Sequence, residues 1–126
     1  FEVFNLDWRI GGIMKIKGKI SDDANNFAIN LGSKCSELAF HFNPRFNESV
    51  IVCNSMCSDS WQQEHRDHHF PFHKGSSVKL IIEFLGEKFQ VKLPDDHEVE
   101  FPNRHGYEKI DYLNIRGGFK VISFKM

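Results

Sequence analysis

Apolar and polar residues alternate along much of the chain with a period of two residues. Met14–Ile20 (MKIKGKI) shows this alternation most cleanly, with lysine or glycine between apolar positions. Because successive side chains of a strand point to opposite faces, this segment is expected to bury one face and expose the other. No segment carries the 3.6-residue periodicity of a helix. The pattern therefore predicts an all-β chain.

The expected strands are short and are separated by turns rich in glycine, proline, asparagine and serine, every eight to twelve residues or so. They are Phe1–Leu6, Met14–Ile20, Phe27–Leu31, Leu38–Phe46, Val50–Asn54, Glu64–Phe70, Val78–Phe84, Lys88–Leu93, His97–Phe101, Ile110–Ile115 and Phe119–Phe124. Val78–Phe84 and Lys88–Leu93 should form a hairpin, and Arg116-Gly117-Gly118 should separate the last two strands. Ser33–Glu37 and Ser55–Ser60 are expected to be loops. This spacing favours an antiparallel β-sandwich or barrel.

Length and composition fit this fold class. With 126 residues the chain is expected to be one domain, residues 1–126, large enough for a real core. The 13 phenylalanines indicate a core of aromatic rings between sheets. The net charge of −1, with basic and acidic residues mixed, argues against a nucleic-acid partner, which would need a basic stripe. No apolar run is long enough to span a bilayer, so membrane insertion is not expected.

The three cysteines, Cys35, Cys53 and Cys57, are an odd number without metal-ligand spacing. We interpret them as reduced thiols of a protein made in the cytosol. Cys53 should point into the core, since its neighbours Val52 and Asn54 face the other way. The histidines at 65, 68, 69 and 73 are not expected to converge on a metal, because on a strand His65 and His69 share a face while His68 points away. No cofactor is predicted.

The most informative stretch runs from His41 to Arg66. In its first segment, HFNPRF, polar residues occupy every second position, so His41, Asn43 and Arg45 should share one face. Two further segments, VIVCN and WQQEHR, add Asn54, then Trp61, Glu64 and Arg66. A polar row of this kind is costly to bury and suits a polar ligand.

Three interpretations compete for this stretch. A saccharide needs donors and acceptors beside one aromatic ring, and this stretch supplies both, with Glu64 able to bridge Arg45 and Arg66. A glycoside hydrolase would use Glu48 and Glu64 as its carboxylate pair, but nearby arginines would lower the pKa of Glu64 and spoil it as a general acid. An ion-pair network without a ligand would leave Trp61 unexplained, since surface ion pairs contribute little stability.

The residues HxNPR, VxN and WxxExR resemble the carbohydrate-recognition signature of the galectins, the β-galactoside-binding lectins. The matching positions are His41, Asn43, Pro44, Arg45, Val52, Asn54, Trp61, Glu64 and Arg66. Flanking phrases such as FAINLG, LAFHFNPRF, VKLPD and GGFKVISF extend the likeness over almost the whole chain, at the length of a single-domain galectin.

This resemblance implies roles for the residues. His41, Asn43 and Arg45 would hold the axial 4-hydroxyl of galactose, and Asn54 would hold the 6-hydroxyl together with Glu64. Trp61 would stack on the apolar face of the sugar. Arg45, Glu64 and Arg66 would reach the neighbouring glucose or N-acetylglucosamine.

The resemblance also implies a jelly-roll sandwich, no catalytic residue, no metal, and β-galactoside glycans of glycoproteins or glycolipids as partners. Family habit predicts a homodimer through the terminal strands, cytosolic synthesis, and secretion without a signal peptide. Two positions depart from the family pattern: Gln62 stands where glycine is common, and the turn Asn47–Ser49 is shorter than in several relatives. The alternative is a structural or protein-interaction module of the same fold that has lost its sugar affinity.

Overall fold

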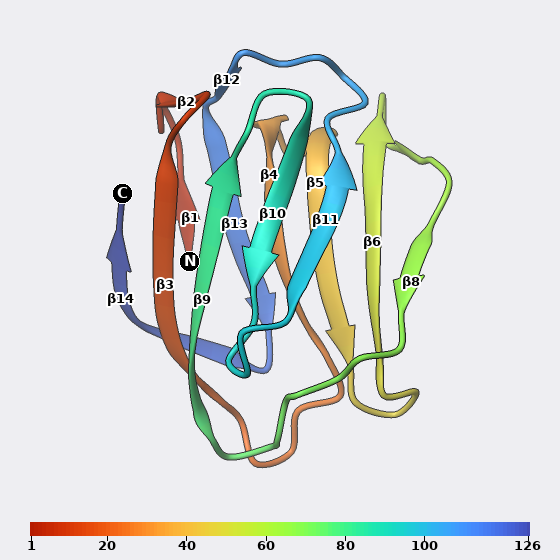
Figure 1. Ribbon diagram of the computed structural model, residues 1–126, viewed down its shortest axis with the longest axis vertical. Helices are drawn as coiled ribbons and strands as arrows, with labels where there is room; N and C mark the ends of the chain where they lie inside the picture. Colours follow the sequence, from red (N-terminus) through yellow and green to blue (C-terminus); the bar gives the residue numbers. More distant parts are fainter.

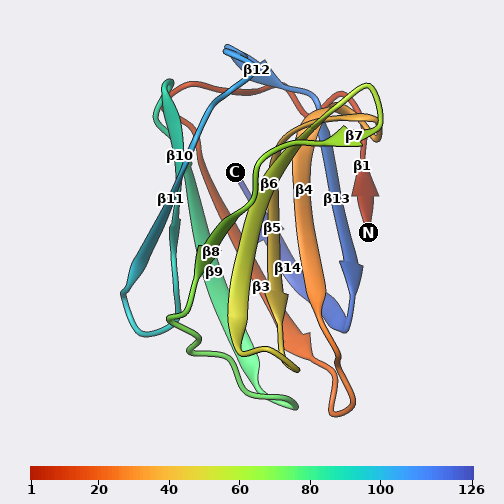
Figure 2. The same cartoon turned by 90° about the vertical axis from the view of Figure 1, so that its right-hand side faces the viewer.

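The computed structural model describes all residues from Phe1 to Met126 and consists of two main antiparallel sheets packed face to face. The view in Figure 1 looks onto the sandwich, and Figure 2 shows the two layers side by side. The predicted all-β sandwich is confirmed. The structure contains no helix long and apolar enough to cross a membrane.

The seven-stranded sheet has the order β1-β13-β4-β5-β6-β7, and β8 also pairs with β6. Its strands are β1 (Glu2–Val3), β4 (Phe27–Lys34), β5 (Glu37–Arg45), β6 (Val50–Cys57), β7 (Ser60–Trp61), β8 (His65–Asp67) and β13 (Tyr112–Gly117). In its central strands β4, β5 and β6, most residues on both faces are hidden from solvent.

The five-stranded sheet has the order β11-β10-β9-β3-β14. Its strands are β3 (Ile13–Ile20), β9 (Ser77–Phe84), β10 (Lys88–Lys92), β11 (Glu98–Pro102) and β14 (Phe119–Lys125). A two-stranded ribbon of β2 (Trp8–Arg9) and β12 (Lys109–Ile110) lies at one end of the sandwich (Figure 1).

The core lies between the two sheets and is rich in phenylalanine, as composition predicts. Eight of the 13 phenylalanines are buried: Phe27, Phe40, Phe42, Phe72, Phe84, Phe89, Phe101 and Phe119. The ring of Phe40 on the seven-stranded sheet stacks on Phe89 and Phe101 of the other, with centroid distances of 5.3 and 5.4 Å. Such contacts join the layers, since offset aromatic pairs add to the stabilisation from burial alone.

Strand alternation is confirmed most clearly in β3, where exposed and buried residues follow one another without exception. The predicted hairpin between β9 and β10 is also present, closed by a hydrogen bond from Leu85 N to Lys88 O of 2.9 Å. At the predicted glycine turn Gly117 has a φ of 88°, and a Cβ there would lie 2.6 Å from Asn26 O. Only glycine fits that conformation without strain.

Several boundaries differ from the predictions. The expected loop Ser33–Glu37 is a tight hairpin in which Lys34 of β4 pairs with Glu37 of β5, and the expected strand Ile110–Ile115 is divided between β12 and β13. The strand expected at Phe1–Leu6 is reduced to β1, and that expected at Glu64–Phe70 to β8. The expected loop Ser55–Ser60 is instead largely a hairpin: β6 continues to Cys57 and pairs with β7. Its small polar residues carry no strand signal, and pairing with neighbouring strands decides their conformation.

Candidate functional site

The predicted polar row lies on β5, on the face of the seven-stranded sheet that points away from the core. Phe40 and Phe42 face inward and are completely buried, so His41, Asn43 and Arg45 face outward, as strand alternation requires. His41 and Asn43 line a groove of about 370 Å³ that Trp61 also lines and that extends across β4 and β13, whereas Arg45 lies outside its lining.

His41 is oriented by a chain of amides behind it. Its Nδ1 lies 2.6 Å from Asn30 Oδ1, and Asn30 Nδ2 donates to Asn114 Oδ1 at 3.3 Å. With an amide oxygen as its partner Nδ1 carries the proton, so Nε2 is left as an acceptor. Burial, followed by the positive charge of Arg45, lowers the pKa of His41 to about 4. The imidazole is therefore neutral at physiological pH.

Asn43 is buried and its amide is held in one orientation. Its Nδ2 donates to Phe27 O at 2.8 Å, and its Oδ1 accepts from Arg45 Nε at 2.9 Å. The Nε–H of Arg45 is therefore already bonded to Asn43, and this bond fixes the position of the guanidinium beside the groove.

Two arginines and two glutamates form a network beside this row. Glu64 bridges the arginines as predicted: its Oε1 lies 3.0 Å from Arg66 Nε, and its Oε2 lies 3.9 Å from Arg45 Nη2. Glu48, from the turn between β5 and β6, bridges the same pair, at 3.4 Å from Arg45 Nη1 and 3.0 Å from Arg66 Nη1. Hydrogen bonds from Arg66 and Arg45 lower the pKa of Glu48. Four charges therefore hold each other before any ligand arrives.

Asn54 and Trp61 complete the site from β6 and β7. Asn54 is buried opposite His41 in the strand register, and its Nδ2 donates to Gln62 O at 3.1 Å. The Trp61 side chain is half exposed, and its ring centroid lies 4.5 Å from that of His41. An aromatic face is thus presented to the groove beside several hydrogen-bonding groups.

Gln62, one of the two departures from the family pattern, does not distort the chain. Its φ is not positive, whereas Ser58 and Asp59 earlier in the loop do have positive φ. Its side-chain Nε2 donates to Ser60 O at 2.9 Å, within its own turn. The backbone path from Trp61 to Glu64 therefore does not require glycine at this position.

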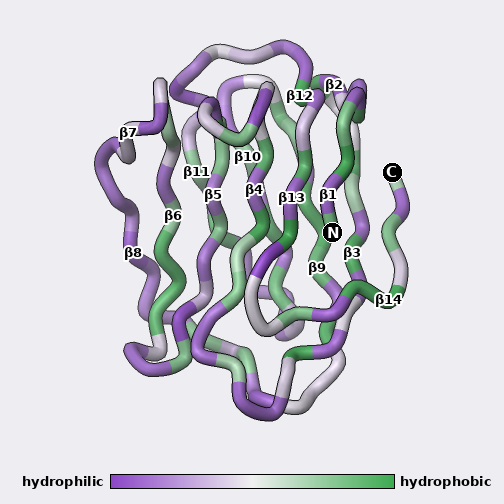
Figure 3. Tube along the Cα trace, turned by 180° about the vertical axis from the view of Figure 1, so that it is seen from behind, coloured by the Kyte–Doolittle hydropathy of each residue, from purple (hydrophilic) through white to green (hydrophobic).

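The structure brings all seven predicted residues onto neighbouring strands or their connections. Arg66 pairs with Val52 in the β6–β8 register, and Glu64 lies just before β8. In Figure 3 the segment from β7 to β8 is coloured mostly hydrophilic. Their role in binding remains a prediction. His41, Asn43 and Trp61 line the groove, while Arg45, Glu64 and Arg66 form the charge network beside it.

Sequence reasoning missed the residues that hold these groups in place. Asn30 and Asn114 support His41 through the amide chain, and Arg104 donates to Ser55 Oγ at 3.1 Å beside Asn54. Glu48, which the sequence suggested only as one carboxylate of a hydrolase, bridges Arg45 and Arg66 instead. Asn30, in FAINL, and Asn114, in YLNI, carry a signal in the sequence, namely a polar residue between apolar neighbours inside a strand.

The neighbouring thiol and histidines are partly as expected. Cys53 belongs to the core, and burial raises the pKa of its thiol to about 12. The prediction that His65 and His69 share a strand face was wrong, because β8 ends at Asp67, before His69. His65 packs against Phe101, while His69 lies 2.5 Å from Asp95 Oδ2.

Comparison with known proteins gives a consistent result. The sequence model of the family described as Galactoside-binding lectin matches residues 3–126. Human Galectin-2 is 50% identical over 125 residues, covering 99% of this chain and 95% of that protein. The crystal structure of chicken Galectin 2 has a TM-score of 0.98 and 78% identity, covering 99% of this chain and 96% of that one.

A third protein, CG-16, described as a homodimeric agglutinin from chicken liver, has a TM-score of 0.94 and 43% identity, covering 99% of this chain and 97% of its own. Fold, signature residues and comparisons agree, and the chain belongs to the galactoside-binding lectins, the galectin family.

Proposed function

We propose that this protein binds β-galactosides of the lactose and N-acetyllactosamine type in the groove beside Trp61. The observation that carries the proposal is a polar site whose side chains orient one another through hydrogen bonds and ion pairs. His41 offers an acceptor, and Arg45 offers further donors to the same hydroxyl. Prior orientation lowers the entropic cost of binding, which matters for a small, strongly hydrated ligand.

The arrangement also supports discrimination between sugars. In the proposed pose the axial 4-hydroxyl of galactose lies among His41, Asn43 and Arg45, and the 6-hydroxyl lies by Asn54 and Glu64. Arg45, Glu64 and Arg66 reach the second sugar, and Trp61 covers the apolar face of the first. A glucose unit has its 4-hydroxyl equatorial, so it would leave the three β5 groups without their partner. Unpaired polar groups of this kind weaken binding strongly.

Isothermal titration with lactose and maltose tests the proposal. Lactose should give saturable heat and maltose none at the same concentrations. Absence of heat with lactose would instead favour the alternative of a structural or interaction module without sugar affinity, and retention on lactose-agarose gives an independent answer.

The site is proposed to bind without catalysis. A glycosidase needs one carboxyl group that stays protonated near neutral pH to act as general acid. Here Glu48 and Glu64 are both ion-paired to arginines, and the pKa of Glu48 is lowered. Incubation with a nitrophenyl β-galactoside should release no nitrophenol, whereas release that is lost in Glu64→Gln would refute this part of the proposal.

The protein is further proposed to act as a homodimer that cross-links glycans. The edge strands β1 and β14 lie at the same side of the sandwich (Figure 1), and Phe1 packs against Phe124 with ring centroids 5.7 Å apart. Exposed apolar side chains gather on these terminal segments, namely Phe1, Phe4, Ile122 and Met126. Sedimentation at micromolar concentration should show a dimer, and a monomer at all concentrations would contradict it.

A further inference from the structure

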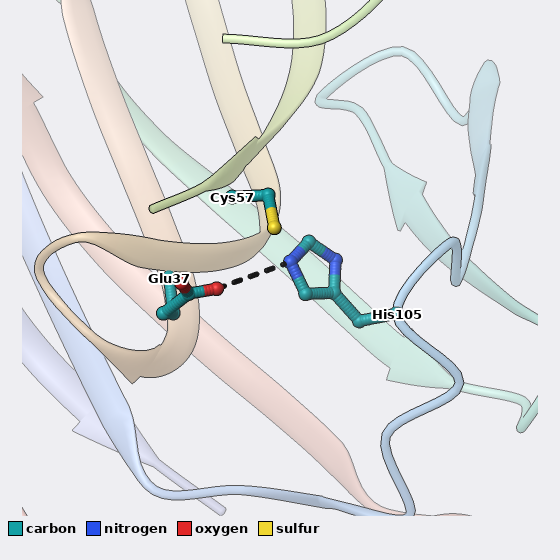
Figure 4. Close-up of side chains that lie close together, drawn as sticks. All are labelled: Glu37, Cys57 and His105. Carbon is teal, nitrogen blue, oxygen red and sulfur yellow. Dashed lines mark ion pairs between the residues drawn. The ribbon is translucent and has the colours of Figure 1, made fainter. Parts of the chain in front are cut away.

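Glu37, Cys57 and His105 come from three separate segments and meet at one end of the seven-stranded sheet. Glu37 begins β5, Cys57 ends β6, and His105 lies in the loop between β11 and β12 (Figure 4). One potential ligand atom from each residue lies within 4.8 Å of the other two. No spacing in the sequence connects these positions, so only the fold brings them together.

Neighbouring groups hold two of the three side chains in place. Glu37 Oε1 accepts hydrogen bonds from Ser58 N at 2.7 Å and Ser58 Oγ at 3.2 Å, and its Oε2 lies 3.7 Å from His105 Nε2. The backbone hydrogen bond from Ser58 lowers the pKa of Glu37, which is therefore ionised. The His105 ring packs against Tyr107 with centroids 4.9 Å apart.

We propose that Glu37, Cys57 and His105 bind a zinc ion, with water as the fourth ligand. Thiolate sulfur, imidazole nitrogen and carboxylate oxygen are the ligands that zinc takes in proteins, whereas calcium and magnesium take oxygen alone. A tetrahedral ion with bonds of about 2.0–2.3 Å places its ligand atoms roughly 3.3–3.8 Å apart, so side-chain shifts of about 1 Å close the site. Ser58 would serve as the group that orients the carboxylate.

Binding changes the protons at the site in a defined way. The Cys57 thiol gives its proton to solvent, because the thiolate is the ligand. His105 Nε2 now lies 3.0 Å from Met56 O, which can only accept, so this nitrogen carries a proton. To bind the metal Nε2 must lose that proton, and the neutral ring then carries its one proton on Nδ1. The affinity should therefore rise with pH.

A zinc ion at this position would connect two segments that border the proposed sugar site. Cys57 pairs with Ser60 in the hairpin that carries Trp61, and His105 follows Arg104, which contacts Ser55. A cavity of about 490 Å³ between them, lined also by Gln62 and Gln63, gives the ion a path from solvent. Zinc would thus tie the Trp61 hairpin to the loop that borders Asn54.

Titration of the untagged protein with Zn²⁺, and with Co²⁺ as a spectroscopic probe, tests the site. We expect one Zn²⁺ per chain and a thiolate-to-cobalt charge-transfer band that Zn²⁺ abolishes. Cys57→Ser should remove the band, and His105→Gln should weaken Zn²⁺ affinity at least ~10-fold, in protein that keeps its circular dichroism spectrum.

Two matched variants serve as controls. Cys35→Ser removes the other exposed thiol, and His69→Gln removes a histidine of the separate His69–His97 pair. Both should bind like wild type. Binding without a thiolate band, or an equal loss in Cys35→Ser and Cys57→Ser, would overturn the proposal.

A second, independent feature lies on the outer face of the five-stranded sheet. Six exposed lysines on three adjacent strands face solvent there: Lys15, Lys17, Lys19, Lys79, Lys120 and Lys125. They are directly opposite each other in three pairs, Lys15 with Lys125, Lys17 with Lys79 and Lys19 with Lys120. None of the six takes part in an ion pair.

This arrangement is unfavourable for the fold by itself, because like charges opposite each other in a sheet destabilise it. The net charge of −1 does not reveal this local concentration of lysines, which only the sheet assembles. Acidic residues gather instead on β11, where Glu100 pairs with Lys88 of the neighbouring strand. The lysines remain as a lattice spaced by roughly 5 Å between strands and 7 Å along them.

We infer that this lysine face binds a sulfated polysaccharide chain. Four of the six lysines, Lys15, Lys17, Lys79 and Lys125, border a hollow of about 550 Å³ that Ser77 and Ser123 also line, so hydroxyl and sulfate groups would both find partners. Arginine and exposed aromatic rings, which read and stack nucleic-acid bases, do not line this hollow. A hollow also suits a single chain better than a flat bilayer.

Heparin serves as the probe, and binding is measured over a range of salt concentrations. Lys17→Gln/Lys79→Gln should weaken binding and reduce the slope of log affinity against log salt by about 2, whereas Lys88→Gln/Lys92→Gln on the same sheet should change little. Lactose should not compete. Displacement by lactose, equal loss in both double variants, or tighter binding to DNA or anionic vesicles than to heparin would overturn the inference.

Discussion

The outer faces of the two sheets differ in their exposure to solvent and in their polar residues. In the five-stranded sheet β3 alternates strictly between buried apolar and exposed residues, and its outer face is open to solvent. In the seven-stranded sheet the outer face is polar but largely covered. All five buried polar residues belong to this sheet: Asn30, Asn43, Asn54, Ser55 and Asn114.

The five-stranded sheet thus supports the fold, whereas the outer face of the seven-stranded sheet carries the candidate site. Burying amides is unfavourable unless each finds a partner, and here they bond with each other, with backbone and with the residues of the groove. A fully bonded polar network is rigid, so it can hold His41 and Arg45 in fixed positions. The outer face of the other sheet has no buried polar residue, and the six lysines on β3, β9 and β14 make no ion pair.

A substitution in the core between the two sheets should have the largest effect, measured as the free energy of unfolding. Phe40→Ala removes a ring that stacks on Phe89 and Phe101, and it should lower the free energy of unfolding by about 3–5 kcal/mol. Lys92→Ala on the exposed face should change it by less than about 0.5 kcal/mol. Urea denaturation measures both, and similar values for the two would mean that the core does not join the sheets as described.

Lowering the pH should destabilise the protein through His41, on the polar outer face of the seven-stranded sheet. Because its pKa is lowered to about 4 in the folded state, the unfolded state binds a proton first as the pH falls below about 6.5. Stability should therefore decrease by about 3 kcal/mol between pH 6.5 and 4, and it should be fully present above that range. His41→Gln should lose this component, while His73→Gln, at an exposed position, should keep it. Denaturation at several pH values makes the comparison.

Substitutions in the groove should remove binding without unfolding the sheet. Arg45→Ala deletes a charged donor and Trp61→Ala the aromatic surface, and each should reduce lactose affinity by about 100-fold or more. Calorimetry measures the affinity, and circular dichroism verifies the fold. If both variants still bind lactose, the ligand uses another face of the molecule.

The charge network at the rim should give the smallest effect. Glu48→Gln loses the bridge between Arg45 and Arg66, but both arginines keep Glu64 and are partly exposed. We expect lactose affinity to fall only a few-fold, and less at high salt, because solvent and salt screen such pairs. A loss as large as that of Arg45→Ala would show that Glu48 contacts the sugar directly.

Much of the fold could be predicted from local patterns. Alternation placed β3, β9, β10 and β14 nearly correctly because each has one face in the core and one in water. The same rule failed at Ser55–Ser60, where polar residues form a hairpin that exists because β5 and β7 pair with β6. Hydrogen bonding between distant segments leaves no trace in such a short stretch.

The site divides in the same way. The sequence by itself determined which side chains share a face: His41, Asn43 and Arg45 on β5, with Cys53 turned inward. Only the tertiary structure decided what surrounds them, because burial, strand register and the meeting of Glu37, Cys57 and His105 depend on residues far apart in the chain. Local periodicity follows from backbone geometry that every residue shares. The placement of lysines opposite each other on β9, β3 and β14, by contrast, follows from how the sheet is assembled.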